Sequence, residues 1–512
     1  MVDIRPSAMS PGGAGNAPSP AAQGGEARTR ILLANTLLRD NHRDSPEHAR
    51  GLAMLQQEAE GGGSREACWF LGAYYLQVTT WTDAHAEAAR WLERAAVAGV
   101  APAIDRLANL FLQGIGVAYS LPRALELQRH LADAGFQQAA WETGYLLDVS
   151  DDAPEGAGAS AFARACALGY PPAYYALGLR MALARGERAD RAFARALLLR
   201  AADGSFPDAR AAADELVPER EVGPSASDWH RRLKDNLAAA RGLRQALTPM
   251  DAPLGAGSPN PIVMRLEAHF AAIGHPSIAL DADGRLAVDA RARMRLHASP
   301  QAWDWLAQCP RIAVSRGFAT REECAHLMHK AGSSLRPPEG YLKAGANDES
   351  ERRQFNGQGH PRNVLDADGV VRMVERRIAA MAGWTMQALE PHSVIRYLPG
   401  NEYKPHVDSY SPEQIERNRI ERGDHGGQRT ASFLLYLHAP EEGGETYFHF
   451  PDLPVRGERG MGLLHYNAIP DGSGDAQSLH SGRPVVRGEK WIWRSTLRQH
   501  SLYPSRSNPD PP

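Results

Sequence analysis

Four copies of the pattern Gly-x-x-x-Ala recur in the first half of the chain at nearly constant intervals. The copies are 36, 36 and 34 residues apart and begin at Gly63, Gly99, Gly135 and Gly169. An apolar stretch with helical spacing precedes and follows each copy, so one period holds two helices. A fixed period of this length predicts an α-solenoid, in which each helix pair buries its apolar face against its neighbours. We therefore expect helical repeats over residues 28–215.

The aromatic side chains of these repeats allow two interpretations. They fall on the apolar faces of the expected helices and include Trp69, Tyr74, Tyr75, Trp91, Trp141 and Tyr174. Helical spacing favours packing inside the repeat core. The functional alternative is that some of them line a concave surface that binds peptides.

The segments on either side of the repeats differ from them in composition. Residues 1–27 are rich in Pro, Gly, Ala and Ser and lack a hydrophobic period, which predicts a disordered leader. Residues 216–308 are expected to be a connector with helices near 229–247 and 262–273. A short hairpin in this connector is expected to turn at Asp283-Gly284.

From Pro310 onwards the sequence pattern differs from that of the repeats. Two helices are expected first, one with a capping box between Thr320 and Glu323 and one over residues 369–382. Short strands separated by Gly and Pro turns follow, with one expected over Tyr403 to Tyr410, and they predict an all-β sandwich or barrel. A polar insertion at 411–428 is expected to be a lid or an exposed loop. We place this domain at residues 309–502 and a disordered tail at 503–512.

His406-Val-Asp408 is the stretch of this domain that points to chemistry. Alternate side chains of an extended segment share a face, so His406 and Asp408 can hold one metal ion. With a second histidine, for which His480 is the candidate, they form the set that leaves three positions open on a non-haem Fe(II) centre. Another triplet, His42-Arg-Asp44, lies in a polar segment without a strand pattern, and we interpret it as a chance occurrence.

Residues 309–500 resemble the catalytic domain of the prolyl 4-hydroxylase family of Fe(II)/2-oxoglutarate dioxygenases. The matching stretches include Val394 to Asp408, Arg429 to Leu437, Glu442 to Thr446 and Ser478 to Trp491. Residues 48–215 are similar to Sel-one-like repeats, which are relatives of the tetratricopeptide repeat. The two resemblances imply a multidomain α + β chain, an α-solenoid of helix pairs followed by a double-stranded β-helix, or jelly roll.

The resemblance also implies the roles of individual residues. The iron ligands would be His406, Asp408 and His480. Lys490, ten residues after the distal histidine, would bind the far carboxylate of 2-oxoglutarate, and only five of the 57 basic residues of this chain are lysine. Tyr397 would hydrogen-bond 2-oxoglutarate, and Ser432 would place a hydroxyl near the same ligand.

The spacing alone does not determine the position or role of other side chains in this region. Strand alternation places Lys490 on one face with Ile492 and Arg494, and either face of that strand could be the inner one. His449 and His465 also lie on expected strands. We interpret both as core or surface histidines that do not bind the metal.

The composition excludes several classes of partner. A formal net charge of -3 predicts neither nucleic acid nor acidic membranes as partners. The four cysteines lack CxxC spacing, which argues against a disulfide framework or a zinc site and indicates a reducing compartment. The sequence starts without the layout of a signal peptide and contains no apolar run long enough to span a bilayer, so we expect a cytoplasmic protein.

The favoured hypothesis is a dioxygenase that hydroxylates a peptidyl residue, with proline as the first candidate, in a protein recruited by the repeats. The resemblance implies Fe(II), 2-oxoglutarate, O2 and ascorbate as cofactors and co-substrates, and succinate and CO2 as products. One alternative is hydroxylation of a free amino acid or another small molecule, with the repeats serving assembly. An alternative of another class is a repeat scaffold without catalytic activity.

Overall fold

The computed structural model describes residues 20–40, 45–77, 83–154, 156–184, 186–245, 247, 253–255, 260–289, 294–332, 334–335, 357–359 and 367–503. The chain forms two compact units, Met1–Leu71 and Gly72–Pro512. None of the described helices combines the length and the apolar character that crossing a lipid bilayer requires.

The first unit contains a helix pair, α1 (Pro20–Asp40) and α2 (Pro46–Glu60), and the start of α3 (Arg65–Gln77). The pair packs closely, because a Cβ added at Gly51 would lie 2.8 Å from the carbonyl oxygen of Ala34. Since α1 begins at Pro20, the predicted leader is too long by residues 20–27. The composition of residues 20–27 does not indicate a helix. The buried contacts of α1 come later in the chain, at Ile31 and Ala34. Residues 1–19 lie outside the described residues.

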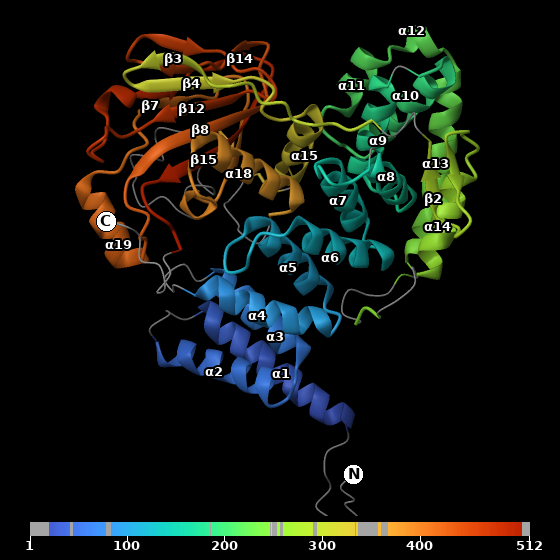
Figure 1. Cartoon of the computed structure of the whole chain (residues 1–512), viewed down its shortest axis with the longest axis horizontal. Helices are drawn as coiled ribbons and strands as arrows, with labels where there is room; N and C mark the ends of the chain where they lie inside the picture. The colour runs from blue at the N-terminus through green and yellow to red at the C-terminus, as the bar shows by residue number, and fades with distance from the viewer. Residues whose placement is uncertain are drawn as a thin grey trace, which may run out of the picture. The chain divides into compact units, whose positions relative to one another are not determined.

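The second unit begins with the remaining repeats (Figure 1). Their helices are α4 (Ala84–Val97), α5 (Ala101–Gln113), α6 (Leu121–Asp133), α7 (Gln137–Asp148), α8 (Ala157–Ala167), α9 (Pro171–Leu183), α10 (Arg188–Asp203), α11 (Ala209–Leu216) and α12 (Glu219–Val222). The repeated Gly-x-x-x-Ala frame has a local cause. Each glycine has a positive φ between two helices, 77° at Gly99 and 82° at Gly169, and each alanine is buried in the next helix. The predicted helical repeats are confirmed.

The connector has the elements that its sequence predicts. They are α13 (Ser225–Arg244), α14 (Pro261–Ala271), β1 (Ile278–Leu280) and β2 (Leu286–Val288). Gly284 has a φ of 74° in the turn of the β1–β2 hairpin. The predicted end of the connector is wrong by a few residues, because β3 (Asp304–Gln308) already pairs with β4 (Arg311–Ser315) of the following domain.

The second half is built on two antiparallel sheets (Figure 1). The seven-stranded sheet has the order β3-β4-β12-β8-β15-β6-β5 and the four-stranded sheet the order β11-β10-β13-β7. The strands not yet given are β5 (Gln358–Gly359), β6 (Ser393–Tyr397), β7 (Tyr403–His406), β8 (Arg429–His438), β10 (Thr446–Phe448), β11 (Leu453–Val455), β12 (Gly462–Tyr466), β13 (His480–Gly482) and β15 (Lys490–Arg498), and a separate pair comprises β9 (Glu442–Gly443) and β14 (Val485–Arg487). The predicted β-rich jelly-roll domain is confirmed.

The two faces of the seven-stranded sheet have different neighbours. On the inner face, Leu434 and Ile492 form one apolar cluster with Phe448 of the four-stranded sheet. On the outer face, Phe433 and Trp493 join a second cluster with α15 (Arg321–Gly332) and α18 (Gly369–Ala382). The predicted capping box of α15 is confirmed, since Thr320 and Glu323 exchange two hydrogen bonds of 2.8 and 3.1 Å.

The polar insertion at 411–428 contains a helix, α19 (Pro412–Arg422), where a lid or a loop was expected. The sequence carries the signal for this helix. Ser411 and Gln414 form a capping box, and Pro412 occupies the first helical position, where its missing N–H costs nothing.

Within the second unit, the repeats are joined to the β-rich domain by buried charges. Arg180 on α9 is 1% exposed; its Nη2 lies 2.5 Å from Asp148 Oδ2, and its Nη1 donates to Glu322 Oε2 on α15 at 2.8 Å. One cluster of buried apolar side chains also runs from α5 to the outer face of the seven-stranded sheet. The repeats of this unit and the β-rich domain therefore share a core.

Aromatic and acidic residues of α7 add to this junction. The hydroxyl of Tyr145 donates to Glu323 at 2.7 Å, and the ring of Trp141 stacks on His326 with centroids 4.2 Å apart. Glu142 accepts a hydrogen bond of 3.0 Å from the N–H of Gly369, and burial together with the nearby Asp368 raises the pKa of Glu142 to about 8. Trp141, one of the candidates for a peptide-binding surface, thus contacts the chain's own β-rich domain.

Candidate metal centre

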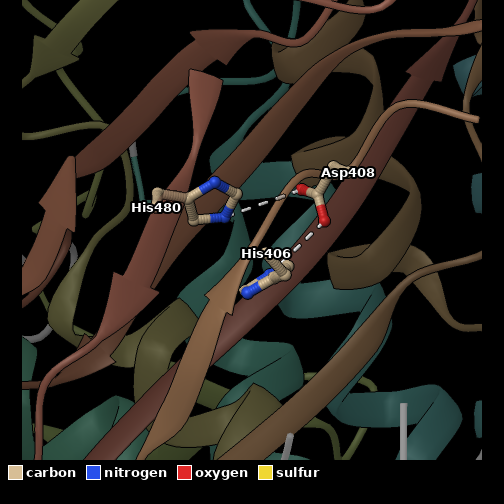
Figure 2. Close-up of side chains that lie close together, drawn as sticks. All are labelled: His406, Asp408 and His480. Atoms are coloured by element: carbon tan, nitrogen blue, oxygen red, sulfur yellow. Dashed lines mark ion pairs between the residues drawn. The ribbon is translucent and has the colours of Figure 1, made fainter. Parts of the chain in front are cut away.

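Strand register brings the three predicted metal ligands together. His406 ends β7 and His480 begins β13, and the two residues lie directly opposite each other in the antiparallel pair. Asp408 follows β7 by two residues, and Figure 2 shows its carboxylate facing both imidazoles from one side. His406 Nε2 lies 3.7 Å from Asp408 Oδ1, and His480 Nε2 lies 4.0 Å from Asp408 Oδ2. The three ligand atoms lie within 4.8 Å of one another.

The strand predicted over Tyr403 to Tyr410 is shorter than expected. It ends at His406 because its partner β13 starts opposite that residue, so no strand remains to pair with Val407 and Asp408. The side chain of Asp408 nevertheless lies next to that of His406. The two residues are on the same side of the chain, as alternation predicts, although Asp408 is not part of the strand.

Both histidines are oriented by carbonyl groups two residues earlier. His406 Nδ1 lies 2.8 Å from the oxygen of Lys404, and His480 Nδ1 lies 2.9 Å from the oxygen of Ser478. A carbonyl oxygen only accepts, so each Nδ1 carries the hydrogen and each Nε2 offers a lone pair to a metal. Burial, with the neighbouring His480, lowers the pKa of His406 to about 3, which keeps its ring neutral.

The carboxylate of Asp408 is held from behind by a hydroxyl. Ser432 Oγ donates to Asp408 Oδ2 at 2.5 Å, and Asn467 Nδ2 donates to Ser432 Oγ at 2.9 Å. Burial alone would raise the pKa of Asp408, but His480 and Arg494 hold it well below its ordinary value. Asp408 is therefore an anion, as a metal ligand must be. Ser432 therefore contacts a metal ligand, and its predicted place near 2-oxoglutarate stays a prediction.

Lys490 lies at the start of β15 and is 3% exposed. Its Nζ donates to the carbonyl oxygen of Gly444 at 2.7 Å and lies 3.5 Å from Thr446 Oγ1. The rings of Tyr397 and Tyr436 lie 5.4 and 5.6 Å from the same nitrogen. Within the described part of the chain this ammonium forms no ion pair, and burial lowers the pKa of Lys490 to about 8.

A small cavity of about 30 Å³ lies between the metal ligands and Lys490. It is lined by both sheets, and Tyr397 faces it from β6, directly opposite Lys490 in the strand register. Ile492 and Arg494 also line the cavity, so the face of β15 that carries Lys490 is the inner one. All predicted site residues except Ser432 line this cavity.

Sequence reasoning missed several residues of the centre. His465 lies beside Asp408, and Asn467 supports Ser432. Alternation along β12 could have placed both on one face, but only register with β8 shows that this face looks towards the metal ligands. His449 contacts Ser481 and lies outside the cluster of His406, Asp408 and His480. The triplet at His42 lies outside the described residues.

Comparison with known proteins identifies the class of this chain. The family described as the 2OG-Fe(II) oxygenase superfamily matches residues 392–496. Two similar proteins come from Arabidopsis thaliana. Probable prolyl 4-hydroxylase 9 is 33% identical over 205 residues, which cover 37% of this chain and 69% of that protein. Prolyl 4-hydroxylase 13 is 30% identical over 207 residues, 38% of this chain and 72% of that protein.

Two solved structures resemble parts of the chain. A viral collagen prolyl hydroxylase from Paramecium Bursaria Chlorella virus-1 has 22% identity and a TM-score of 0.28, covering 36% of this chain and 95% of that one. A Sel1 repeat protein from Oxalobacter formigenes has 23% identity and a TM-score of 0.33, covering 50% of this chain and 74% of that one. These TM-scores are low, so the fold rests on the strand order and helix pairs described above.

The strand order, the clustered ligands and the matched region define a 2OG-Fe(II) oxygenase. The chain belongs to this superfamily, and its C-terminal region is a homologue of the prolyl 4-hydroxylases. Membership implies Fe(II) and 2-oxoglutarate at the site. The residues fit both. Two imidazoles and a carboxylate converge at one end of the cavity, and its lining contains a buried cation without an ion pair among the described residues.

Proposed function

We propose that the chain is an Fe(II)- and 2-oxoglutarate-dependent dioxygenase that hydroxylates a peptidyl residue, with proline as the first candidate. O2 and 2-oxoglutarate would be consumed, succinate and CO2 released, and one oxygen atom placed in a C–H bond of the substrate. The iron would be held by His406, Asp408 and His480. Similarity to prolyl 4-hydroxylases supports the choice of proline.

Lys490 is the observation that supports the proposal best. A buried ammonium is costly unless an anion pairs with it. Among the described residues Lys490 contacts a carbonyl, a hydroxyl and two aromatic rings, and the carboxylate of Glu445 acts on it from beyond ion-pair distance. A dicarboxylate that binds the metal with one end could pair its other carboxylate with the ammonium of Lys490. Tyr397 lines the same cavity, and we propose that its hydroxyl donates to that ligand.

The protein's own part in the reaction is positioning. Bound Fe(II) supplies the redox chemistry with O2 and the 2-oxo acid. The carbonyls of Lys404 and Ser478 fix the two imidazoles, and Ser432 fixes the carboxylate. Buried walls such as Ile395 and Leu434 keep water from the reacting atoms. The ring of Tyr403 stacks on His406 with centroids 3.8 Å apart and shields that ligand on one side.

The affinity for 2-oxoglutarate is expected to fall as the pH rises above about 8. The pKa of Lys490 is about 8 without the ligand, so at higher pH the ammonium must take up a proton before it can pair with the carboxylate. The dissociation constant should rise by up to about tenfold per pH unit in this range. Isothermal titration of the Mn(II)-loaded protein with 2-oxoglutarate between pH 7 and 9.5 measures it.

Lys490→Arg is the matched control for this pH dependence. A guanidinium stays charged throughout the range, so the affinity of the variant should change little with pH, whatever its absolute value. Lys490→Ala should bind 2-oxoglutarate weakly at every pH. A wild-type affinity that is constant from pH 7 to 9.5 would contradict the assignment.

The substrate is tested by succinate formation with peptides. Purified protein is supplied with Fe(II), ascorbate, O2 and labelled 2-oxoglutarate, and succinate is measured with proline-containing peptides and with matched peptides that carry alanine at the proline positions. Stimulation by the first set alone, with a mass increase of one oxygen, is expected. Stimulation by free amino acids alone would favour a small-molecule hydroxylase, the second candidate.

We propose that a protein substrate is recruited by the repeats. Because α5, α7 and α9 contact α15 and α18, recruitment would use repeat surfaces other than this junction. Turnover of a full-length protein substrate should then fall when those outer surfaces are mutated, while turnover of a short peptide should not. We also propose a cytoplasmic location, for which the four free cysteines are suitable.

A further inference from the structure

His465 is a buried histidine behind the metal ligands. It lies on β12 directly opposite Ser432 of β8, and opposite residues of paired strands share a face. Its side chain is 1% exposed. The centroid of its ring lies 4.5 Å from that of His480 in an edge contact and 5.2 Å from that of Phe448. It therefore touches one metal ligand and shares its surroundings with the hydroxyl that holds another.

Neither ring nitrogen of His465 has a hydrogen-bond partner among the described residues. A buried polar group in this state costs free energy, so an apolar ring would pack at the same place at lower cost. His465 Nε2 lies 3.9 Å from Asp408 Oδ2, the oxygen that also accepts from Ser432. The other oxygen, Oδ1, lies near His406, and Oδ2 also lies 4.0 Å from His480 Nε2. Ser432 and His465, from neighbouring strands, thus both place a donor near Oδ2 of Asp408.

The separation of 3.9 Å is about 1 Å longer than a hydrogen bond. The ligand atoms are up to 4.8 Å apart, and an ion about 2 Å from each of them would draw them closer together. The carboxylate of Asp408 is one of the groups that this closure can move. A donor beside Oδ2 can act on the carboxylate during that movement.

We propose that His465 is a positioning residue of the metal centre. Its Nε2–H donates to Asp408 Oδ2 when the ligands close around the ion, which directs Oδ1 to the metal, and its ring fixes the ring of His480. This inference rests on the proposed function, since it needs a metal at His406, Asp408 and His480. Residues that orient ligands in this way typically contribute 10–100-fold to metal affinity.

The test compares His465→Phe with His465→Gln. Phenylalanine keeps a ring of similar size without N–H groups, whereas the amide of glutamine places a donor near the position of Nε2. Fe(II) is titrated into each apoprotein under anaerobic conditions, and the absorption that appears on adding 2-oxoglutarate is recorded. His465→Phe is expected to weaken Fe(II) binding by about tenfold or more and to shift this absorption. His465→Gln is expected to bind Fe(II) nearly as wild type.

The outcomes separate this inference from the proposed function. Wild-type affinity and spectrum in His465→Phe would show that His465 only fills space and would overturn the inference alone. Equal losses of affinity in both variants, with lower melting temperatures of the apoproteins, would also overturn it, because packing would then explain the effect. Absence of Fe(II) binding to the wild-type protein would overturn the proposed function and this inference with it.

Discussion

A chain that begins at residue 294 and lacks the repeats is expected to lose its cooperative thermal unfolding and to form no succinate. In the second unit, α15 and α18 cover the outer face of the seven-stranded sheet and are themselves covered by α5, α7 and α9. Removing those helices exposes apolar surface and opens the core of the oxygenase domain to water. Circular dichroism melting and the succinate assay measure the loss.

The control for this truncation is a chain that begins at residue 65. It lacks α1 and α2, which belong to the first compact unit, and it keeps α3 and the whole of the second unit. It is expected to melt cooperatively and to keep its turnover. A stable, active fragment from residue 294 would contradict the shared core.

Arg180→Ala tests the same junction with one substitution. Asp148 and Glu322 would stay buried without their cation, which typically costs about 3–5 kcal/mol of unfolding free energy. Arg90→Ala is the matched control, because Arg90 pairs with Glu87 at an exposed surface where such a pair contributes less than about 1 kcal/mol. Urea denaturation gives both values, and equal small losses would show that the junction is not a structural core.

His480→Ala is expected to lower turnover by at least about 100-fold. The variant loses one of two imidazoles, which should cost more than the 10–100-fold typical of residues that only orient ligands. His480 is 5% exposed and packs against Phe448, so the apoprotein's melting temperature must be measured alongside. A folded His480→Ala variant with normal turnover would contradict the assignment of the ligands.

His449→Ala is the matched control for this loss. His449 lies just after β10 and contacts the hydroxyl of Ser481, the residue after His480, but it is not part of the metal cluster. Its removal is expected to leave Fe(II) binding unchanged. The comparison separates the loss of a ligand from the general loss of a histidine near the site.

The sequence predicts those parts of the molecule that local patterns determine. The Gly-x-x-x-Ala frame predicts the repeats because only glycine adopts the positive φ of Gly99 and Gly169 without strain. The resemblance to the dioxygenase family also implies that Tyr397, His406, Asp408, His480 and Lys490 share one site, and these residues line one cavity.

What the sequence does not predict depends on register and long-range packing. Ser432 was placed correctly near the site, but alternation gives the face of a strand and not the atom that the hydroxyl meets. Charged residues such as Arg180 and Glu322 normally lie on the solvent-exposed face of a helix. They are buried here because the β-rich domain packs on the repeats. The helix α19 is different, since its capping box at Ser411 was readable in the sequence.

The central claim is that His406, Asp408, His480 and Lys490 form one site for Fe(II) and 2-oxoglutarate. Its most direct test is an anaerobic titration of the full chain with Fe(II) and then 2-oxoglutarate, followed by the visible absorption that a chelated 2-oxo acid gives. The account predicts saturable absorption in the wild-type protein, none in His480→Ala, and a higher 2-oxoglutarate requirement in Lys490→Ala. Bound Fe(II) without this absorption in the wild-type protein, or an unchanged titration in Lys490→Ala, would contradict it.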